Sequence, residues 1–258
     1  MKRVRQFFSR YRNGLQRAGA VLLALAVWQG LAMGVGQQLL VPSPLSVVER
    51  LGGIWQEADF WGTVWFTFRK IVAGFLLGLG FGLGLGALAG RFPLFEILFR
   101  PWATMIKSIP VASFIILALV WLSAGNVPIL AGLLMVVPVV YANVTQGIEA
   151  ADPQLLEMAR MFGWKRPKVW RRILLPTALP PFLAACEACV GMCFKATIAA
   201  EVIGVPRNAM GTQLYHAKIY LQTDALMAWT VVIILLSMVT EKLLREAIER
   251  GRRRVHHP

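Results

Sequence analysis

The sequence predicts an all-α, polytopic membrane protein with six transmembrane helices. Hydrophobic residues make up 57% of the chain and charged residues only 16%, whereas a soluble domain has about 45–50% apolar and about 25% charged residues. Apolar runs of about 20 residues recur, as the thickness of the bilayer core requires of spanning helices. We therefore expect one transmembrane domain over residues 18–241, between basic cytoplasmic tails at 1–17 and 242–258.

The net charge of +14 is compatible with nucleic-acid binding or with orientation in a membrane. A nucleic-acid surface gathers its Lys and Arg residues into one stripe or face. Here the basic residues flank the apolar runs instead, as they do in the cytoplasmic segments of membrane proteins. The lipid bilayer is therefore the expected partner, and no nucleic acid is expected.

The first span is expected at 18–36, after a tail with six Lys and Arg residues and no acid. A cleaved secretory signal would have a shorter apolar region and a small-residue cleavage site. The end of this run, Met33 to Gly36, is a poor cleavage sequence, so we expect an uncleaved helix with its basic end in the cytoplasm. Residues 37–63 then form an outside loop with a short surface helix at 46–55.

The second span, at 64–89, carries a glycine at every fourth position, which lets another helix approach its backbone closely. The intervening Gly80 and Gly84 suggest a dinucleotide fingerprint, but no strand precedes them and no acidic ribose ligand follows. A P-loop is absent from the sequence, so we expect no ATP site and no cofactor in this chain. The glycines expected to pack against another helix are Gly74, Gly78, Gly82, Gly86 and Gly90.

The third span is expected at 101–123 and the fourth at 128–146, joined by a tight outside turn. Pro110 lies inside the third span, and proline kinks a membrane helix. Lys107 is a candidate for the translocation path, because ionisable groups at membrane depth usually face a partner or a water-filled route. Asn143 is a second candidate, and the alternative is that it hydrogen-bonds a neighbouring helix.

The polar loop 152–176 is the only long polar segment between two strongly apolar ones. Asp152 is a plausible N-cap and Pro153 suits the first helical position. Gly163 suits the C-terminal end of that helix, and a second basic helical run follows at 166–174. The apolar residues on one face of the first helix are Leu155, Leu156, Ala159 and Phe162.

The fifth span, at about 180–200, contains all three cysteines on one helical face: Cys186, Cys189 and Cys193. A metal or redox site is one interpretation. A contact between membrane helices is the other, and it is favoured because no His or carboxylate pair lies beside the cysteines. Metal binding is therefore not expected.

Glu187 and Lys195 share a face of the fifth span, two turns apart. At 1.5 Å per residue, Lys195 lies roughly 20 Å beyond the cytoplasmic end of the span. Both residues are candidates for the translocation path, where Lys195 would favour an anionic ligand. A pair between Lys195 and a glutamate is an equal alternative.

The sixth span is expected at 225–241. Six spans place the four basic segments at 1–17, 91–100, 152–172 and 242–254 on one side and the weakly charged loops on the other. A missed span would place basic segments on both sides of the membrane. The charge pattern therefore supports six spans and two cytoplasmic termini.

The loop 152–176 resembles the cytoplasmic loop of ABC-importer permeases. In that family the loop has the sequence pattern Glu-Ala-Ala, then Gly after three residues, Ile after nine more, and Leu-Pro after one more. Met158 replaces the middle Ala, and the literal Glu149-Ala150-Ala151 does not fit the later spacing. The sequence Pro42-Ser43-Pro44, followed by an Arg69-containing entry to the glycine-rich second span, is similar to the nitrate/sulfonate/taurine branch of the family. The matching residues of the loop are Glu157, Ala159, Gly163, Ile173, Leu175 and Pro176.

This resemblance covers about residues 39–240 and implies the membrane subunit of a type I importer in the bacterial cytoplasmic (inner) membrane. A second permease subunit, in a homodimer, would complete the path. ATP and Mg²⁺ would bind to separate ATPase subunits, and an extracytoplasmic solute-binding protein would deliver a small solute. The loop would be the coupling helix, with Leu155 and Phe162 in the ATPase groove; a solvated basic loop is the alternative.

Two other functions fit the sequence less well. A secondary transporter driven by an ion gradient often shows inverted repeats and midplane carboxylates, but the sequence has no visible repeat and only Glu187 as a membrane carboxylate. An intramembrane enzyme would need a catalytic motif, and neither a zinc-protease nor a serine-hydrolase motif occurs. We therefore expect a transport subunit rather than an enzyme.

Overall fold

The computed structural model describes residues 19–20, 22–37 and 39–255. The basic tail at 1–17 and the C-terminal residues 256–258 lie outside this range. The described chain is helical and contains no strand. It divides into two compact units, one of Met1–Phe60 with Gln213–Val232 and one of Trp61–Thr212 with Ile233–Pro258.

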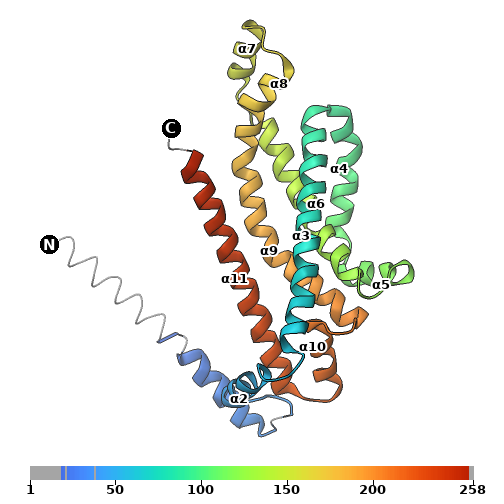
Figure 1. Cartoon of the computed structure of the whole chain (residues 1–258), viewed down its shortest axis with the longest axis vertical. Coiled ribbons are helices and arrows are strands. Elements are labelled where there is room, and N and C mark those ends of the chain that lie inside the picture. Colours follow the sequence, from blue (N-terminus) through green and yellow to red (C-terminus); the bar gives the residue numbers. More distant parts are fainter. Residues whose placement is uncertain (1–18, 21, 38, 256–258) are drawn as a thin grey trace, which may run out of the picture. The chain divides into compact units, whose positions relative to one another are not determined.

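Three long apolar helices form the core of the larger unit: α3 (Phe60–Arg91), α6 (Val127–Glu149) and α9 (Leu175–Gly204). Helix α6 lies against both α3 and α9 (Figure 1). The buried residues between them are mostly small or β-branched, including Ile71, Val136, Val140, Cys189 and Phe194. This packing gives each helix a fixed neighbour over most of its length.

The glycine stripe of α3 is the surface that contacts α6. A Cβ atom on Gly78, Gly82 or Gly86 would lie 2.6–2.8 Å from the Cβ atom of a valine on α6. Cβ atoms on Gly74 and Gly90 would collide with α6 in the same way, whereas Gly80 and Gly84 have no atom within 4 Å. The four-residue spacing in the sequence thus corresponds to one continuous helix contact.

The third span differs from its prediction. Instead of one helix over 101–123, the structure has α4 (Pro93–Ser108) and α5 (Val111–Trp121), bent by 102° at the break between them. Pro110 lacks an N–H, and Ile109 before it takes an extended conformation with ψ of 128°, as residues before proline tend to do. The predicted kink is therefore a break, and α5 packs against α6 and α9.

The polar loop also differs from its prediction in one respect. Helix α7 (Pro153–Met161) is separate, but α8 (Arg166–Val169) continues through a π-helical turn at Trp170–Leu174 into α9. Residues 166–204 thus form one unbroken helical segment of 39 residues. The fifth span was expected to begin at about 180, but a π-helical turn, in which the Leu175 N–H donates to Trp170 O, carries the helix on past Pro176. Pro180 and Pro181 lie inside α9.

The smaller unit contains an apolar helix over Leu22–Val35 and α2 (Pro44–Ile54). Ser43 caps α2 by accepting a hydrogen bond from the Ser46 N–H at 3.2 Å, so the predicted surface helix is confirmed. The Trp28 indole N–H donates to the Pro42 carbonyl at 3.1 Å. The Phe60 ring lies 5.4 Å from those of both Trp55 and Trp229.

Two further helices complete the chain, α10 (Met210–Ile219) and α11 (Thr223–Val255). The sixth span was expected to end at 241, but α11 continues to Val255. Among the described residues, four helices are long and apolar enough to cross a membrane, or five if α4 and α5 count as one span. Residues 19–20 and 22–35 are helical and lie within the first span predicted at 18–36, of which residues 18 and 21 lie outside the described range.

Candidate functional site

The hairpin formed by α7 and α8 has strong local signals at both ends of α7. The Asp152 carboxylate accepts a hydrogen bond from the Gln154 N–H at 2.8 Å. At the other end Gly163 has φ of 64°, its N–H donates to Arg160 O at 3.0 Å, and the Trp164 N–H donates to Ala159 O at 2.9 Å. This pair of bonds is a Schellman motif, so α7 begins and ends where the sequence predicts.

The hairpin has a small apolar core of its own. Ala151, Ala159 and Ile173 are buried, and Leu156 and Trp164 pack against them. The Lys168 ammonium lies 4.1 Å from the centre of the Trp164 ring. Ala159 and Ile173 therefore hold the hairpin together rather than lying on its surface.

Apolar side chains also cover the outer face of α7. Phe162 is 73% exposed and Met161 is 88% exposed, and Leu155 and Met158 are exposed as well. Large apolar side chains grouped on a surface mark a site for another molecule. The predicted coupling residues thus fall into an inner set that forms the hairpin core and an outer set available for contact.

Glu157 lies on this outer face. It is exposed and forms no ion pair with a described residue. Leu175 and Pro176, at the start of α9, are exposed too. These residues are open to a partner.

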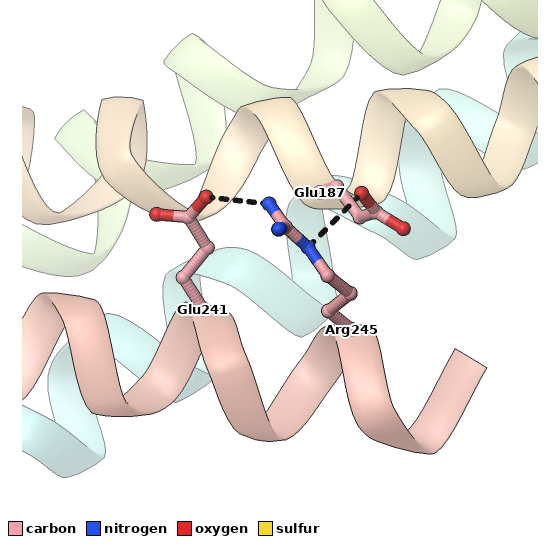
Figure 2. A network of polar contacts seen from close by, with 3 residues as sticks. All are labelled: Glu187, Glu241 and Arg245. Atoms are coloured by element: carbon pink, nitrogen blue, oxygen red, sulfur yellow. Dashed lines mark hydrogen bonds and ion pairs between the residues drawn. The ribbon is translucent and has the colours of Figure 1, made fainter. Parts of the chain in front are cut away.

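Glu187, one of the candidate path residues, is engaged in an ion pair. Its carboxylate lies 3.7 Å from Arg245 of α11, and Arg245 also lies 3.3 Å from Glu241 (Figure 2). Glu187 is level with the middle of α6, because α6 meets α9 near Pro181 at one end and near Cys193 at the other. The pair therefore links α9 to α11 part-way along both helices.

The other residues predicted for the translocation path have different surroundings in the structure. Lys195 is exposed on α9 and forms no ion pair among the described residues, so the alternative of a Lys195–glutamate pair does not hold there. The Asn143 side chain donates to Val139 O of its own helix at 2.9 Å, rather than to a neighbouring helix. Lys107 lines a polar cavity between α4 and α6.

The three cysteines are buried in the core between α6 and α9 and are not joined by disulfides. Cys193 lies against Gly132 of α6 and 3.6 Å from Ile71 O of α3. Among the described residues, no group of His, Cys, Asp or Glu side chains is suited to hold a metal ion. Their role is close packing between helices.

The sequence did not reveal the role of Glu201, near the end of α9. Its carboxylate is fully buried and accepts hydrogen bonds from the Thr67 hydroxyl and the Gly211 N–H, both at 3.0 Å. The Thr67 hydroxyl in turn accepts from the Met210 N–H at 2.9 Å. A carboxylate near a helix end was the only available signal, because its partner on α3 is 134 residues away.

Comparison with known proteins agrees with this architecture. Residues 78–254 match the family described as the inner membrane component of binding-protein-dependent transport systems. The chain is similar to a putative aliphatic sulfonates transport permease protein of Bacillus subtilis, with 27% identity over 86% of this chain and 80% of the relative. It is also similar to the taurine transport system permease protein of Escherichia coli, with 25% identity over 88% of this chain and 85% of the relative.

A solved amino acid ABC transporter has the same fold, with a TM-score of 0.62 and 19% identity over 79% of this chain and 97% of that chain. The methionine ABC transporter in an inward-facing form gives a TM-score of 0.51 and 17% identity over 74% of this chain and 96% of that chain. The predicted all-α permease fold and the resemblance to the sulfonate and taurine branch are confirmed. The chain belongs to the binding-protein-dependent inner membrane components, and it is a multi-pass permease subunit of an ABC importer and not an enzyme.

Proposed function

We propose that two copies of this chain form the translocation path of an importer for a small organic sulfonate. The relatives named for aliphatic sulfonates and taurine support this substrate class, and the exposed Lys195 suits an anion at membrane depth. An extracytoplasmic binding protein would deliver the solute. Separate ATPase subunits would bind ATP and Mg²⁺.

The proposed topology has six spans in the bacterial inner membrane and both termini in the cytoplasm. Four spans are the long apolar helices, the bent pair of α4 and α5 is the fifth, and the helix Leu22–Val35 is the sixth. The basic residues of the hairpin and of the α3–α4 turn would then face the cytoplasm, as the distribution of Lys and Arg favours. The transmembrane domain would cover 18–241, including the loop 152–176.

The observation that carries the proposal is the apolar outer face of a hairpin that is closed by its own core and joined rigidly to α9. A short helix with exposed apolar anchors is suited to a groove on a partner protein, here the ATPase. Leu155 and Phe162 would fill this groove, and Glu157 with the basic residues would fix the orientation. The alternative, a basic loop that only contacts solvent, does not explain why Phe162 and Met161 are exposed.

The continuous helix from 166 to 204 explains how motion at the hairpin would reach the membrane. At about 1.5 Å per residue it is about 58 Å long. Closure of the ATPase dimer would bring the two hairpins together, and each long helix would rock with its hairpin. Such rigid-body motion would switch the path between inside-open and outside-open states.

The test is Phe162→Ala in the complex of permease, ATPase and binding protein, reconstituted in proteoliposomes. We expect at least a tenfold loss of uptake with retained ATP hydrolysis, because an apolar anchor of this size contributes about 2 kcal/mol or more at an interface. Leu243→Ala, at an exposed apolar position on α11, is the control and should transport normally. Normal coupling in the Phe162→Ala complex would refute docking through this face.

A further inference from the structure

The polar cavity between α4 and α6 lies in the larger unit and has a volume of about 220 Å³. Its wall is formed from two helices that meet through aromatic contacts. The Tyr141 ring packs edge-on against Phe99, with 5.0 Å between the ring centres. Eight polar residues line this wall: Glu96, Arg100, Thr104, Lys107, Tyr141, Thr145, Gln146 and Glu149.

The charges around the cavity are mixed in sign. Glu96 and Arg100 form an ion pair with 3.7 Å between the charged atoms, and Arg100 is 77% exposed, so this pair is easily exchanged for another partner. Glu149 and Lys107 form no ion pair with a described residue. Glu149 and Lys107 are therefore available to a ligand, and Glu96 and Arg100 become available when their pair opens.

The two kinds of charge are also distributed along the cavity. Glu96 lies in the first turn of α4 and Glu149 in the last turn of α6. The Phe99–Tyr141 contact brings these two ends together. Arg100 lies one turn further along α4, and Lys107 lies two turns beyond Arg100. Glu96 and Glu149 thus lie near one end of the cavity with Arg100 beside Glu96, and Lys107 lies further along α4. The buried Tyr141 also lines the cavity.

A plain anion would be repelled by the two carboxylates, and a plain cation by Arg100 and Lys107. A ligand with both charges meets opposite charges at each end. We propose that this cavity binds a zwitterionic aminoalkanesulfonate during transport. Glu149 and Glu96 receive its ammonium group, Arg100 and Lys107 receive its sulfonate, and the hydroxyls of Thr104 and Tyr141 complete the site.

This inference rests on the proposed sulfonate function and restricts the substrate class to zwitterionic sulfonates. It assigns the discrimination between zwitterionic and simple sulfonates partly to the permease itself. Glu149 is the specificity-determining residue, because only a ligand with an ammonium group needs its charge. Lys107 serves both kinds of sulfonate.

Uptake by the reconstituted complex tests the assignment, with taurine as the zwitterion and ethanesulfonate as the same ion without the amino group. Glu149→Gln should reduce taurine uptake about tenfold, since a hydrogen bond to a charged group is lost, and should leave ethanesulfonate uptake unchanged or raised. Lys107→Met should reduce the uptake of both. Glu249→Gln, an exposed glutamate of α11, is the matched control and should change neither.

Protection of a reporter thiol gives a second readout that does not depend on turnover. Thr104→Cys places an accessible thiol in the cavity, while the native cysteines are buried. Taurine should slow its labelling in the unaltered background and lose that effect in the Glu149→Gln background. Equal effects of Glu149→Gln on the two sulfonates, or no protection, would overturn the assignment of the cavity alone. Uptake of neither sulfonate by the unaltered complex would overturn the sulfonate function as well.

Discussion

The ion pair between Glu187 and Arg245 allows a quantitative prediction about how α9 and α11 are joined. Arg245 contacts two carboxylates, those of Glu187 and Glu241 (Figure 2), whereas Glu187 has Arg245 as its ion-pair partner among the described residues. Arg245→Gln therefore leaves the partly exposed Glu187 without its ion-pair partner among the described residues. Glu187→Gln leaves Arg245 still paired with Glu241, so it should be the milder change.

The expected loss of stability follows from the exposed fractions of the two side chains. The side chain of Glu187 is 33% exposed and that of Arg245 is 55% exposed, so the pair lies between two limits. Surface pairs contribute about 0.2–1 kcal/mol, and an isolated charge at the centre of a membrane helix costs about 2.5–3.5 kcal/mol. We expect Arg245→Gln to lower stability by about 2 kcal/mol and Glu187→Gln by about 1 kcal/mol. The coupling between them should be about 1 kcal/mol.

Thermal unfolding of the permease complex in lipid nanodiscs measures these differences in a double-mutant cycle. A loss of about 2 kcal/mol corresponds to a fall of about 4–8 °C in the unfolding midpoint for a chain of this size. Arg250→Gln is the control, because its pair with Glu246 is on the surface, with Arg250 78% exposed. Strictly additive effects, or a Glu187→Gln variant less stable than Arg245→Gln, would show that the pair does not join the helices.

Three further predictions concern other parts of the chain. Gly82→Ala should destabilise the permease by about 1–2 kcal/mol, because the new Cβ would lie 2.7 Å from that of Val140; Gly80→Ala, which meets no atom within 4 Å, should be neutral or stabilising in the same unfolding assay. Asp152→Ala should cost about 1 kcal/mol through loss of the helix cap, visible as faster hydrogen exchange in α7 but not in α6; equal exchange would argue against the cap. Lys195→Met should raise the KM for sulfonate uptake several-fold, and unchanged transport and affinity would remove Lys195 from the path.

Features with local causes could be predicted from the sequence. The start and end of α7 depend on Asp152 and Gly163, which act within a few residues of themselves. The glycine stripe indicated a close helix contact because its spacing repeats along one face. The structure adds that the helix in contact with this stripe is α6. Nothing in the sequence around the valines of α6 indicates that they face the glycines of α3.

Features that depend on distant partners could not be predicted. Glu187 was a candidate for the path because its pairing with Arg245, 58 positions later in the numbering, is invisible in the sequence. Pro110 indicated a kink, but the 102° bend reflects the packing of α5 on α6 and α9. The length of the segment 166–204 was underestimated because prolines usually end a helix, whereas here a π-helical turn precedes Pro176 and α9 contains Pro180 and Pro181 in its interior.

The contact between α3 and α6 repeats every four residues on both sides, with Gly78, Gly82 and Gly86 each opposite a valine. A periodic surface of this kind lets α3 and α6 approach closely but does not fix their relative position along the helix axis. A shift of one helix by one turn would regenerate most of the same contacts. Alignment must then come from interactions that occur once. The Thr145 hydroxyl donates to Gly86 O at 3.4 Å, and Thr67 donates to Glu201 at 3.0 Å. Together with the contacts of Cys193 with Ile71 O and of Lys70 with Asn126, these two hydrogen bonds fix the longitudinal position of α3.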